Sequence, residues 1–260
     1  MSFHIHDQRY FQPWLEALQP LSPEELWRRF ISLDKLPAFD FSLEASAVYS
    51  SNIEGNTIDL DAFMNSKIGK QRGRFKAKER EEIESLIEAY RFAQEYALNE
   101  KNLLKAHGIL SKPILPRSQR GKYRDQAVFV YSQYGIEYAA VEAEFVPQKM
   151  KELFDDISLV TKQKNEVNVV FYYAALIHLV FAHIHPFQDG NGRAARLLEK
   201  WFLATHLGAK AWQIPAEQYY KENRHDYYRN IKLGENYYFL NYDQCIPFLT
   251  MLPRALTLFV

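Results

Sequence analysis

The sequence of 260 residues contains a single cysteine, Cys245. One cysteine cannot form a disulfide within the chain, so the sequence excludes the disulfide-stapled scaffolds typical of small secreted proteins. A lone thiol is compatible with a reducing compartment, and we expect the protein in the cytoplasm. The sequence also lacks internal repeats and low-complexity linkers, and it is long enough to bury a large hydrophobic core.

Neither sign of charge is in excess, because 32 Lys and Arg residues balance 32 Asp and Glu residues. Proteins that bind DNA or RNA usually carry a basic footprint. Residues 67–78 are basic, but the acidic run 79–84 follows directly, which is typical of a solvated loop leading into a helix. We therefore expect no nucleic-acid partner.

We expect no secretory signal peptide, since the first ten residues carry charged and histidine side chains in place of a basic segment and an apolar run. The longest apolar segment, residues 167–184, is close to the length that spans a bilayer. Asn168, His178 and His183 interrupt it. We therefore expect a buried central helix and no membrane partner.

Most of the sequence shows the periodicity of helices, and the expected fold class is all-α with one small β-hairpin. A capping box at residues 22–25 opens the first expected helix. The β-branched and aromatic residues 127–131, followed by a turn at 133–135, favour the hairpin. Helices are expected at residues 23–33, 42–55, 78–98, 101–110, 147–160, 166–182, 191–208, 216–233 and 243–258.

The strongest motif covers residues 185–196 and reads His-Pro-Phe-Gln-Asp-Gly-Asn-Gly-Arg-Ala-Ala-Arg. Gly190 and Gly192 lack the Cβ atoms that would keep a bulky anion away from main-chain N–H groups. The helical pattern that follows places these groups at a helix N-terminus, which favours negative charge. Arg193 and Arg196 lie one turn apart and can face the same ligand. Together these residues predict a phosphate-binding site.

Two further side chains of this motif predict chemistry at the phosphate. Asp189 would repel phosphates unless a cation lay between them, which indicates Mg²⁺ held by Asp189 and phosphate oxygens. His185 is the candidate base, because an unperturbed imidazole has a pKa of about 6.5 and accepts a proton near neutral pH. The motif therefore predicts a general base beside a metal-bound polyphosphate.

The same residues match His-x-Phe-x-Asp/Glu-Gly-Asn-Gly-Arg-x-x-Arg at every fixed position, and the chain resembles the Fic family of nucleotidyltransferases. The resemblance implies the Fic/Fido helical fold with a β-hairpin flap, with a catalytic core at 97–260 after a helical region at 1–96. It also implies transfer of AMP from ATP to a Ser, Thr or Tyr hydroxyl of a target protein, with His185 catalytic and Asp189 holding Mg²⁺. The nucleotide-binding residues that it implies are Gly190, Asn191, Gly192, Arg193, Arg196 and Tyr227.

A second motif, Ser-x-x-x-Glu-Gly, ends the helix expected at residues 42–55. A glutamate there faces the negative end of the helix dipole, so we expect a positive partner for Glu54. The motif resembles the inhibitory motif of Fic proteins through Ser50, Glu54 and Gly55. The resemblance implies that Glu54 pairs with Arg196 and obstructs the γ-phosphate position.

The resemblance also assigns roles to the hairpin and to a later helix. The hairpin would be a flap that pins the target segment by main-chain pairing. Its residues are Val128, Phe129, Val130 and Tyr131. Residues 224–228 match the Arg-x-x-Tyr-Tyr portion of the family pattern, which places Tyr227 near the nucleotide base or ribose. Eight residues further on, the family often has asparagine where this chain has Glu235, which leaves nucleotide choice open.

Three alternatives remain open at this point. Residues 190–195 fit the G-x-G-x-x-A dinucleotide fingerprint, although that site needs a preceding strand in a βαβ unit. A metal hydrolase would use His178, His183, His185 and Asp189, but the first two diverge on a helix because they are five residues apart. The third is a Fic-like protein that uses another nucleotide donor, removes AMP, or binds nucleotide without catalysis. The oligomeric state, a homodimer included, is also open.

Overall fold

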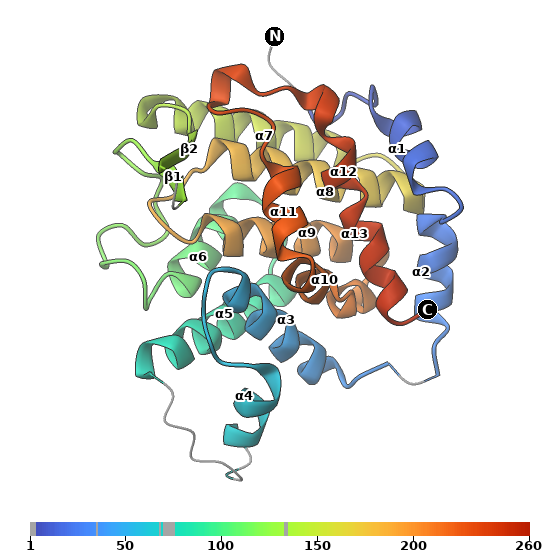
Figure 1. Ribbon diagram of the computed structural model, residues 1–260, viewed down its shortest axis with the longest axis horizontal. Coiled ribbons are helices and arrows are strands. Elements are labelled where there is room, and N and C mark those ends of the chain that lie inside the picture. Colours follow the sequence, from blue (N-terminus) through green and yellow to red (C-terminus); the bar gives the residue numbers. More distant parts are fainter. Residues whose placement is uncertain (1–3, 35, 68, 70–75, 133–134) are drawn as a thin grey trace.

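Helices dominate the computed structural model, which describes residues 4–34, 36–67, 69, 76–132 and 135–260, and one β-hairpin lies at their edge (Figure 1). This arrangement confirms the all-α fold class with a small hairpin. The strands are β1 (Phe129–Ser132) and β2 (Gly135–Ala139). The α-helices are α1 (Phe11–Leu18), α2 (Pro23–Ile31), α3 (Phe39–Ile53), α4 (Leu60–Lys67), α5 (Ala77–Glu95), α6 (Glu100–Leu110), α7 (Val146–Thr161), α8 (Val167–Ile184), α9 (Asn191–Leu207), α10 (Ala216–Glu222), α11 (Arg224–Ile231), α12 (Ile246–Leu249) and α13 (Met251–Arg254).

Helix α8 forms the centre of the molecule, packed between α7 and α9 (Figure 1). By length and composition alone α8 could cross a membrane, but 78% of it is buried inside the structure. A helix that is apolar on all sides is typical of the interior of a large domain. The expected central helix is therefore present, and it continues to Ile184, directly before the phosphate motif.

Local sequence signals account for where α2 begins and for where α9, the helix that starts within the motif, begins and ends. The Ser22 hydroxyl accepts a hydrogen bond from the Glu25 N–H at 3.3 Å, so the expected cap of α2 is present. Helix α9 begins after Gly190 and ends before Gly208, and both glycines have positive φ angles, 83° and 82°. Few other residues adopt that conformation without strain.

The N-terminal helices and the later helices share one hydrophobic core. Helix α3 packs against α5, α9 and α10, and a continuous cluster of buried apolar side chains extends from Ile5 to Leu256. The end of α3, which carries the Ser-x-x-x-Glu-Gly motif, is thereby held against the helix that begins within the phosphate motif.

Two long helices expected near the C-terminus are divided in the structure. The segment 216–233 breaks at Asn223, whose side-chain amide donates to a backbone carbonyl one turn earlier and competes with helix geometry. The segment 243–258 consists of the short helices α12 and α13 with 3₁₀ turns on either side, because Pro247 and Pro253 have no N–H to donate. Helices α1 and α4 were not expected from the sequence.

The hairpin stands beside the C-terminal end of α8. Strands β1 and β2 are antiparallel, with Val130 opposite Tyr138 and an irregularity between Val130 and Tyr131. The Tyr138 hydroxyl donates to the carbonyl of His183 at 2.7 Å, which fastens β2 to the last turn of α8. The turn expected at 133–135 falls mostly on residues 133–134, outside the described residues.

Candidate active site

The loop from α8 to α9 is held in one conformation by its own residues. His185 ends α8 with a left-handed backbone, φ 53°, and its N–H donates to the Phe181 carbonyl at 3.0 Å. The Asn191 side chain donates to the Phe187 carbonyl and accepts from the Phe187 N–H, both at 2.8 Å. The polar atoms of Asn191 are therefore used to brace the loop.

The buried side chain of Arg124 braces the same loop from outside the motif. Its Nε donates to the His185 carbonyl at 2.8 Å, and its own N–H donates to the Pro186 carbonyl at 2.9 Å. Its Nη2 donates to the carbonyl of Val141, just after β2. Arg124 thus couples the position of His185 to that of the hairpin, a role that sequence reasoning missed.

His107, a buried residue of α6, supports the other side of the loop. Its ring stacks on Phe187 with centroids 3.5 Å apart. Its Nδ1 accepts from the Gly121 N–H at 3.1 Å, so Nε2 carries the proton and donates to the Asp189 carbonyl at 3.0 Å. Burial lowers the pKa of His107 to about 4, which keeps the ring neutral.

His185 presents one free ring nitrogen. Its Nδ1 lies 3.2 Å from the Ala182 carbonyl, which can only accept, so Nδ1 holds the proton and Nε2 keeps its lone pair. Burial lowers the pKa of His185 below the ordinary histidine value. The imidazole is therefore neutral at pH 7 and able to take up a proton.

A cavity of about 660 Å³ opens beside this imidazole, a volume typical of small-molecule sites. The loop, the hairpin, the end of α3 and helix α11 surround it. The predicted site residues that line it are Glu54, Val128, Phe129, Val130, His185, Asp189, Gly190, Asn191, Gly192 and Tyr227.

Arg196 contacts Glu54 and Tyr227, which line this cavity, and most of its N–H donors have partners. Its Nε and Nη2 donate to the hydroxyl and carbonyl of Ser50 at 2.8 and 3.0 Å, and Nη2 also donates to Glu54 at 2.7 Å. Its Nη1 donates to the Tyr227 hydroxyl at 3.2 Å. A guanidinium has five N–H donors, and these contacts engage four of them. The predicted contact between Glu54 and Arg196 is present.

Glu54 is ionised in this position. Burial alone would raise the pKa of Glu54, but the positive charges of Arg196 and Arg193 outweigh burial and lower it. Its Oε1 lies against Gly192 in the first turn of α9, where any Cβ would collide with it. The carboxylate therefore occupies the helix N-terminus at which the sequence predicts a phosphate.

Comparison with known proteins agrees with this geometry. A model of the Fic/DOC family matches residues 97–203. This stretch, which carries the loop between α8 and α9, is a Fic/DOC domain. It is 28% identical over 217 residues to "Protein adenylyltransferase Fic" of Nematostella vectensis, an alignment that covers 80% of this chain and 46% of that relative. The chain thus spans about half the length of this curated relative.

Solved structures of Fic proteins share the fold. A Fic family protein from Desulfovibrio desulfuricans G20 superposes with a TM-score of 0.74 at 22% identity, covering 95% of this chain and 72% of that one. A Fic domain containing signaling protein from Bacteroides thetaiotaomicron VPI-5482 gives a TM-score of 0.66 at 23% identity, covering 96% and 94% of the two chains.

The first arginine of the Fic motif has a partner that the sequence did not reveal. Arg193 lies 3.3 Å from a carboxylate oxygen of Glu82 on α5 and 3.9 Å from Asp189. Glu82 belongs to the acidic run 79–84, which was interpreted as a solvated helix start. Nothing in its spacing indicates a partner 111 residues away.

Tyr227 lines the cavity but is almost completely buried, with 2% of its surface exposed. Its hydroxyl lies between Arg196 and His178, the latter at 2.9 Å from Nε2. His178 Nδ1 in turn faces the Glu199 carboxylate at 2.8 Å, so Nδ1 donates and Nε2 accepts from Tyr227. The hydroxyl of Tyr227 is therefore committed to holding Arg196 in place.

The neighbouring Tyr228 is the more exposed of the pair, at 42%. It lines the cavity, stacks under Arg224 with 5.5 Å between the guanidinium carbon and the ring centroid, and donates to the Ile53 carbonyl at 3.0 Å. Tyr228 thus contacts the residue that precedes Glu54 in the chain, and no role of its own was assigned to it from the sequence.

The remaining predicted residues lie around the cavity. Ser50 and Gly55 flank Glu54 without lining the cavity, and the side chain of Tyr131 lies outside the described residues. Glu235 accepts from the N–H of Ala139 through its main-chain carbonyl at 2.9 Å, which ties it to the end of β2.

The competing interpretations lack their structural context. Helix α8, in place of a strand, precedes the G-x-G-x-x-A segment, which the dinucleotide fingerprint does not allow. His183 is committed to the Tyr242 hydroxyl at 3.0 Å and to the Ile231 carbonyl at 2.8 Å, and His178 is committed to Glu199 and Tyr227. These histidines do not converge with His185 on one metal.

Proposed function

We propose that this Fic protein is an adenylyltransferase that transfers AMP from ATP to a Ser, Thr or Tyr hydroxyl of a target protein and that Glu54 inhibits it. The observation that carries the proposal is the neutral His185, whose free Nε2 shares one cavity with Asp189 and the N-terminus of α9. The curated relative's name, which refers to protein adenylyltransferase activity, supports the same reaction class.

In the proposed reaction the target hydroxyl attacks the α-phosphorus of ATP. Its proton passes to Nε2 of His185, a new oxygen–phosphorus bond forms, and the bond from the α-phosphorus to the bridging oxygen breaks, releasing pyrophosphate. Main-chain N–H groups at the start of α9 lie where they would stabilise the anionic transition state. The two arginines of α9 would hold the outer phosphates.

The residues present fit a Mg²⁺ ion at Asp189. Its side chain is 54% exposed toward the cavity, and one carboxylate oxygen is oriented by the Gly190 N–H at 2.6 Å. Mg²⁺ is usually held by one or two carboxylates together with substrate phosphates. When bound there, it would neutralise phosphate charge.

The flap supports a protein substrate. Phe129 and Val130 are 41% and 36% exposed and line the cavity next to His185. In the described part of the chain the sheet has two strands, and the outer side of β2 is already bridged to Asn236. A target segment would add beside β1 by main-chain pairing.

The test is incubation of the purified chain with ATP labelled at the α-phosphate, followed by mass spectrometry of the labelled residues. We expect Glu54→Gly to incorporate AMP and Glu54→Gly/His185→Ala to lose about 100-fold or more of that rate, the contribution typical of a general base. Equal labelling in both variants would refute the mechanism. UTP, GTP and CTP in parallel reactions determine the donor, and pre-labelled protein incubated without ATP reveals any AMP removal.

A further inference from the structure

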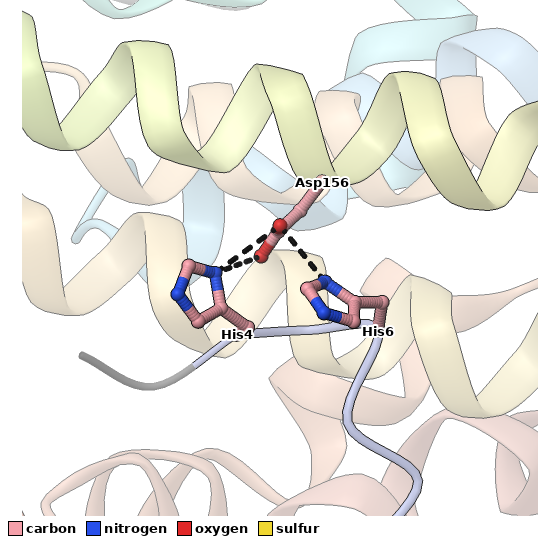
Figure 2. Close-up of side chains that lie close together, drawn as sticks. All are labelled: His4, His6 and Asp156. Atoms are coloured by element: carbon pink, nitrogen blue, oxygen red, sulfur yellow. Dashed lines mark hydrogen bonds and ion pairs between the residues drawn. The ribbon is translucent and has the colours of Figure 1, made fainter. Parts of the chain in front are cut away.

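A second cluster of chemically active side chains lies outside the cavity, where the N-terminal segment crosses α7. Asp156 projects from α7, and the rings of His4 and His6 both turn their Nδ1 atoms toward its carboxylate (Figure 2). His4 Nδ1 is 3.2 Å from both carboxylate oxygens, and His6 Nδ1 is 3.0 Å from Oδ1. Within the described residues, one donor atom from each of the three lies within 4.8 Å of the others.

This donor set is one that transition metals prefer. Two imidazole nitrogens and a carboxylate oxygen are common ligands of Zn²⁺, with a further position left for water. Ligands about 2.1 Å from one Zn²⁺ lie roughly 3.0–3.4 Å from each other, depending on coordination number. The separations between Asp156 and the two imidazoles already fall in or beside this range.

The protein holds the three ligands in place through contacts of their neighbours. Ile5, between the two histidines, is completely buried, and its N–H donates to Oδ2 of Asp156 at 2.9 Å. This bond orients the carboxylate in the way that outer-shell hydrogen bonds orient metal ligands. The Asp156 side chain is 10% exposed, while His4 and His6 are 43% and 42% exposed, so an ion can enter from solvent.

We infer that His4, His6 and Asp156 bind one divalent transition-metal ion, with Zn²⁺ as the preferred occupant. The ion takes the place of the Nδ1 protons that otherwise mediate the contacts with the carboxylate, and each neutral imidazole then carries its single ring proton on Nε2, with no net release of protons. It fastens residues 4–6 to α7 and leaves its remaining position to water. This site is separate from the Asp189 position and does not depend on the proposed transferase activity.

The test uses the full-length chain without an affinity tag, stripped of metal and titrated with Zn²⁺ by calorimetry. We expect the parent chain to bind Zn²⁺ at one site. In both His6→Ala and Asp156→Asn the affinity for Zn²⁺ should fall by more than the 10- to 100-fold that is typical of losing an outer-shell partner. His6 is half-exposed, so His6→Ala should preserve the fold. It therefore tests the site even if Asp156→Asn, which changes a buried residue, does not fold. In ¹⁵N-histidine spectra, the Nδ1 resonances of His4 and His6 should shift on addition of Zn²⁺.

Two control variants distinguish this site from others. Asp189→Ala removes the carboxylate of the cavity, and His225→Ala removes an exposed histidine of α11; both should bind Zn²⁺ as the parent chain does. Loss of binding in Asp189→Ala, or unchanged binding in His6→Ala, would overturn the inference. The same would follow if Zn²⁺ left the melting temperature of the parent chain unchanged while His6→Ala lowered it, since the cluster would then be a hydrogen-bonded clamp alone.

Discussion

The two arginines of α9 each meet a glutamate from the N-terminal helices, and the two pairs are built differently. Arg196 has a completely buried side chain with four engaged N–H donors, and Glu54 approaches it at 2.7 Å while remaining 28% exposed toward the cavity. Arg193 meets Glu82 at 3.3 Å, and its Nε has no hydrogen-bond partner among the described residues.

This difference indicates separate roles for the two pairs. A buried arginine whose donors are all but used cannot bind a phosphate until Glu54 leaves, because the carboxylate occupies the donors and the space. Arg193 has a longer, weaker ion pair, so we expect a phosphate to displace Glu82 from Arg193 more readily than Glu54 from Arg196. We therefore expect the Glu54 pair to control activity and the Glu82 pair to adjust it.

The largest effect should come from removing Glu54. We expect Glu54→Gly to raise AMP incorporation by on the order of 100-fold or more, since breaking a buried ion pair is worth about 3–5 kcal/mol. The same variant should melt at a lower temperature without nucleotide and recover when ATP is added, because Arg196 then regains an anionic partner. Both readouts come from labelling and thermal-shift assays. A variant that gains activity but does not respond to ATP in its melting temperature would contradict this account.

Removing each arginine in the Glu54→Gly background tests the comparison from the other side. Arg196→Ala should lower kcat/KM for ATP by on the order of 100-fold, as loss of a buried transition-state donor does. Arg193→Ala should lower it by about tenfold, which corresponds to one charge-assisted hydrogen bond. Steady-state kinetics measure both. The reverse order of the two losses would contradict the assignment of roles.

A smaller effect is expected from Glu82→Gln in the otherwise unaltered chain. Arg193 and Glu82 are largely buried, but their contact is long at 3.3 Å, so we expect it to contribute about 1 kcal/mol, as an ordinary hydrogen bond does, and AMP incorporation to rise about fivefold. The matched variant Glu54→Gln preserves side-chain size in the same way and should raise it far more. Equal increases in the two glutamine variants would show that both pairs restrain the site alike.

The smallest effect concerns pH. The pKa of Glu54 is lowered in the folded chain, so its pair with Arg196 stabilises the protein above the unfolded value of about 4.3 and ceases to do so as pH falls through the lower folded value. The difference in melting temperature between the parent chain and Glu54→Gln should hold constant from pH 8 to about 5 and close below about 4. Closure between pH 7 and 6 would point instead to a histidine.

The sequence predicted those parts of the site that depend on neighbouring residues. The loop 185–191, the start of α9 and the cap of α2 follow from glycine, proline and hydroxyl residues that act within a few positions. The meeting of Glu54 with Arg196 was also expected, because both belong to recognisable motifs. Whether Glu54 inhibits the enzyme remains a prediction.

Contacts between distant segments could not be predicted, because sequence patterns report only on residues a few positions apart. Arg124 and Glu82 act through partners 61 and 111 residues away, and ordinary loop and helix patterns surround them. Tyr227 was assigned to the nucleotide, yet burial and the hydrogen bonds to Arg196 and His178 commit its hydroxyl to the protein. Periodicity predicted a helix around Tyr227, but it carries no information on the polar side chains that other helices bring to it.

The absence of a side chain at Gly192 limits which substitutions this protein could accept over time. The Glu54 oxygen rests where a methyl group would sit, and the proposed polyphosphate needs the same room. A bulkier residue at this position would exclude both the Glu54 carboxylate and the proposed substrate. If Glu54 inhibits the protein as proposed, a change at the end of α3 would relieve the inhibition, and a change at Gly192 would not.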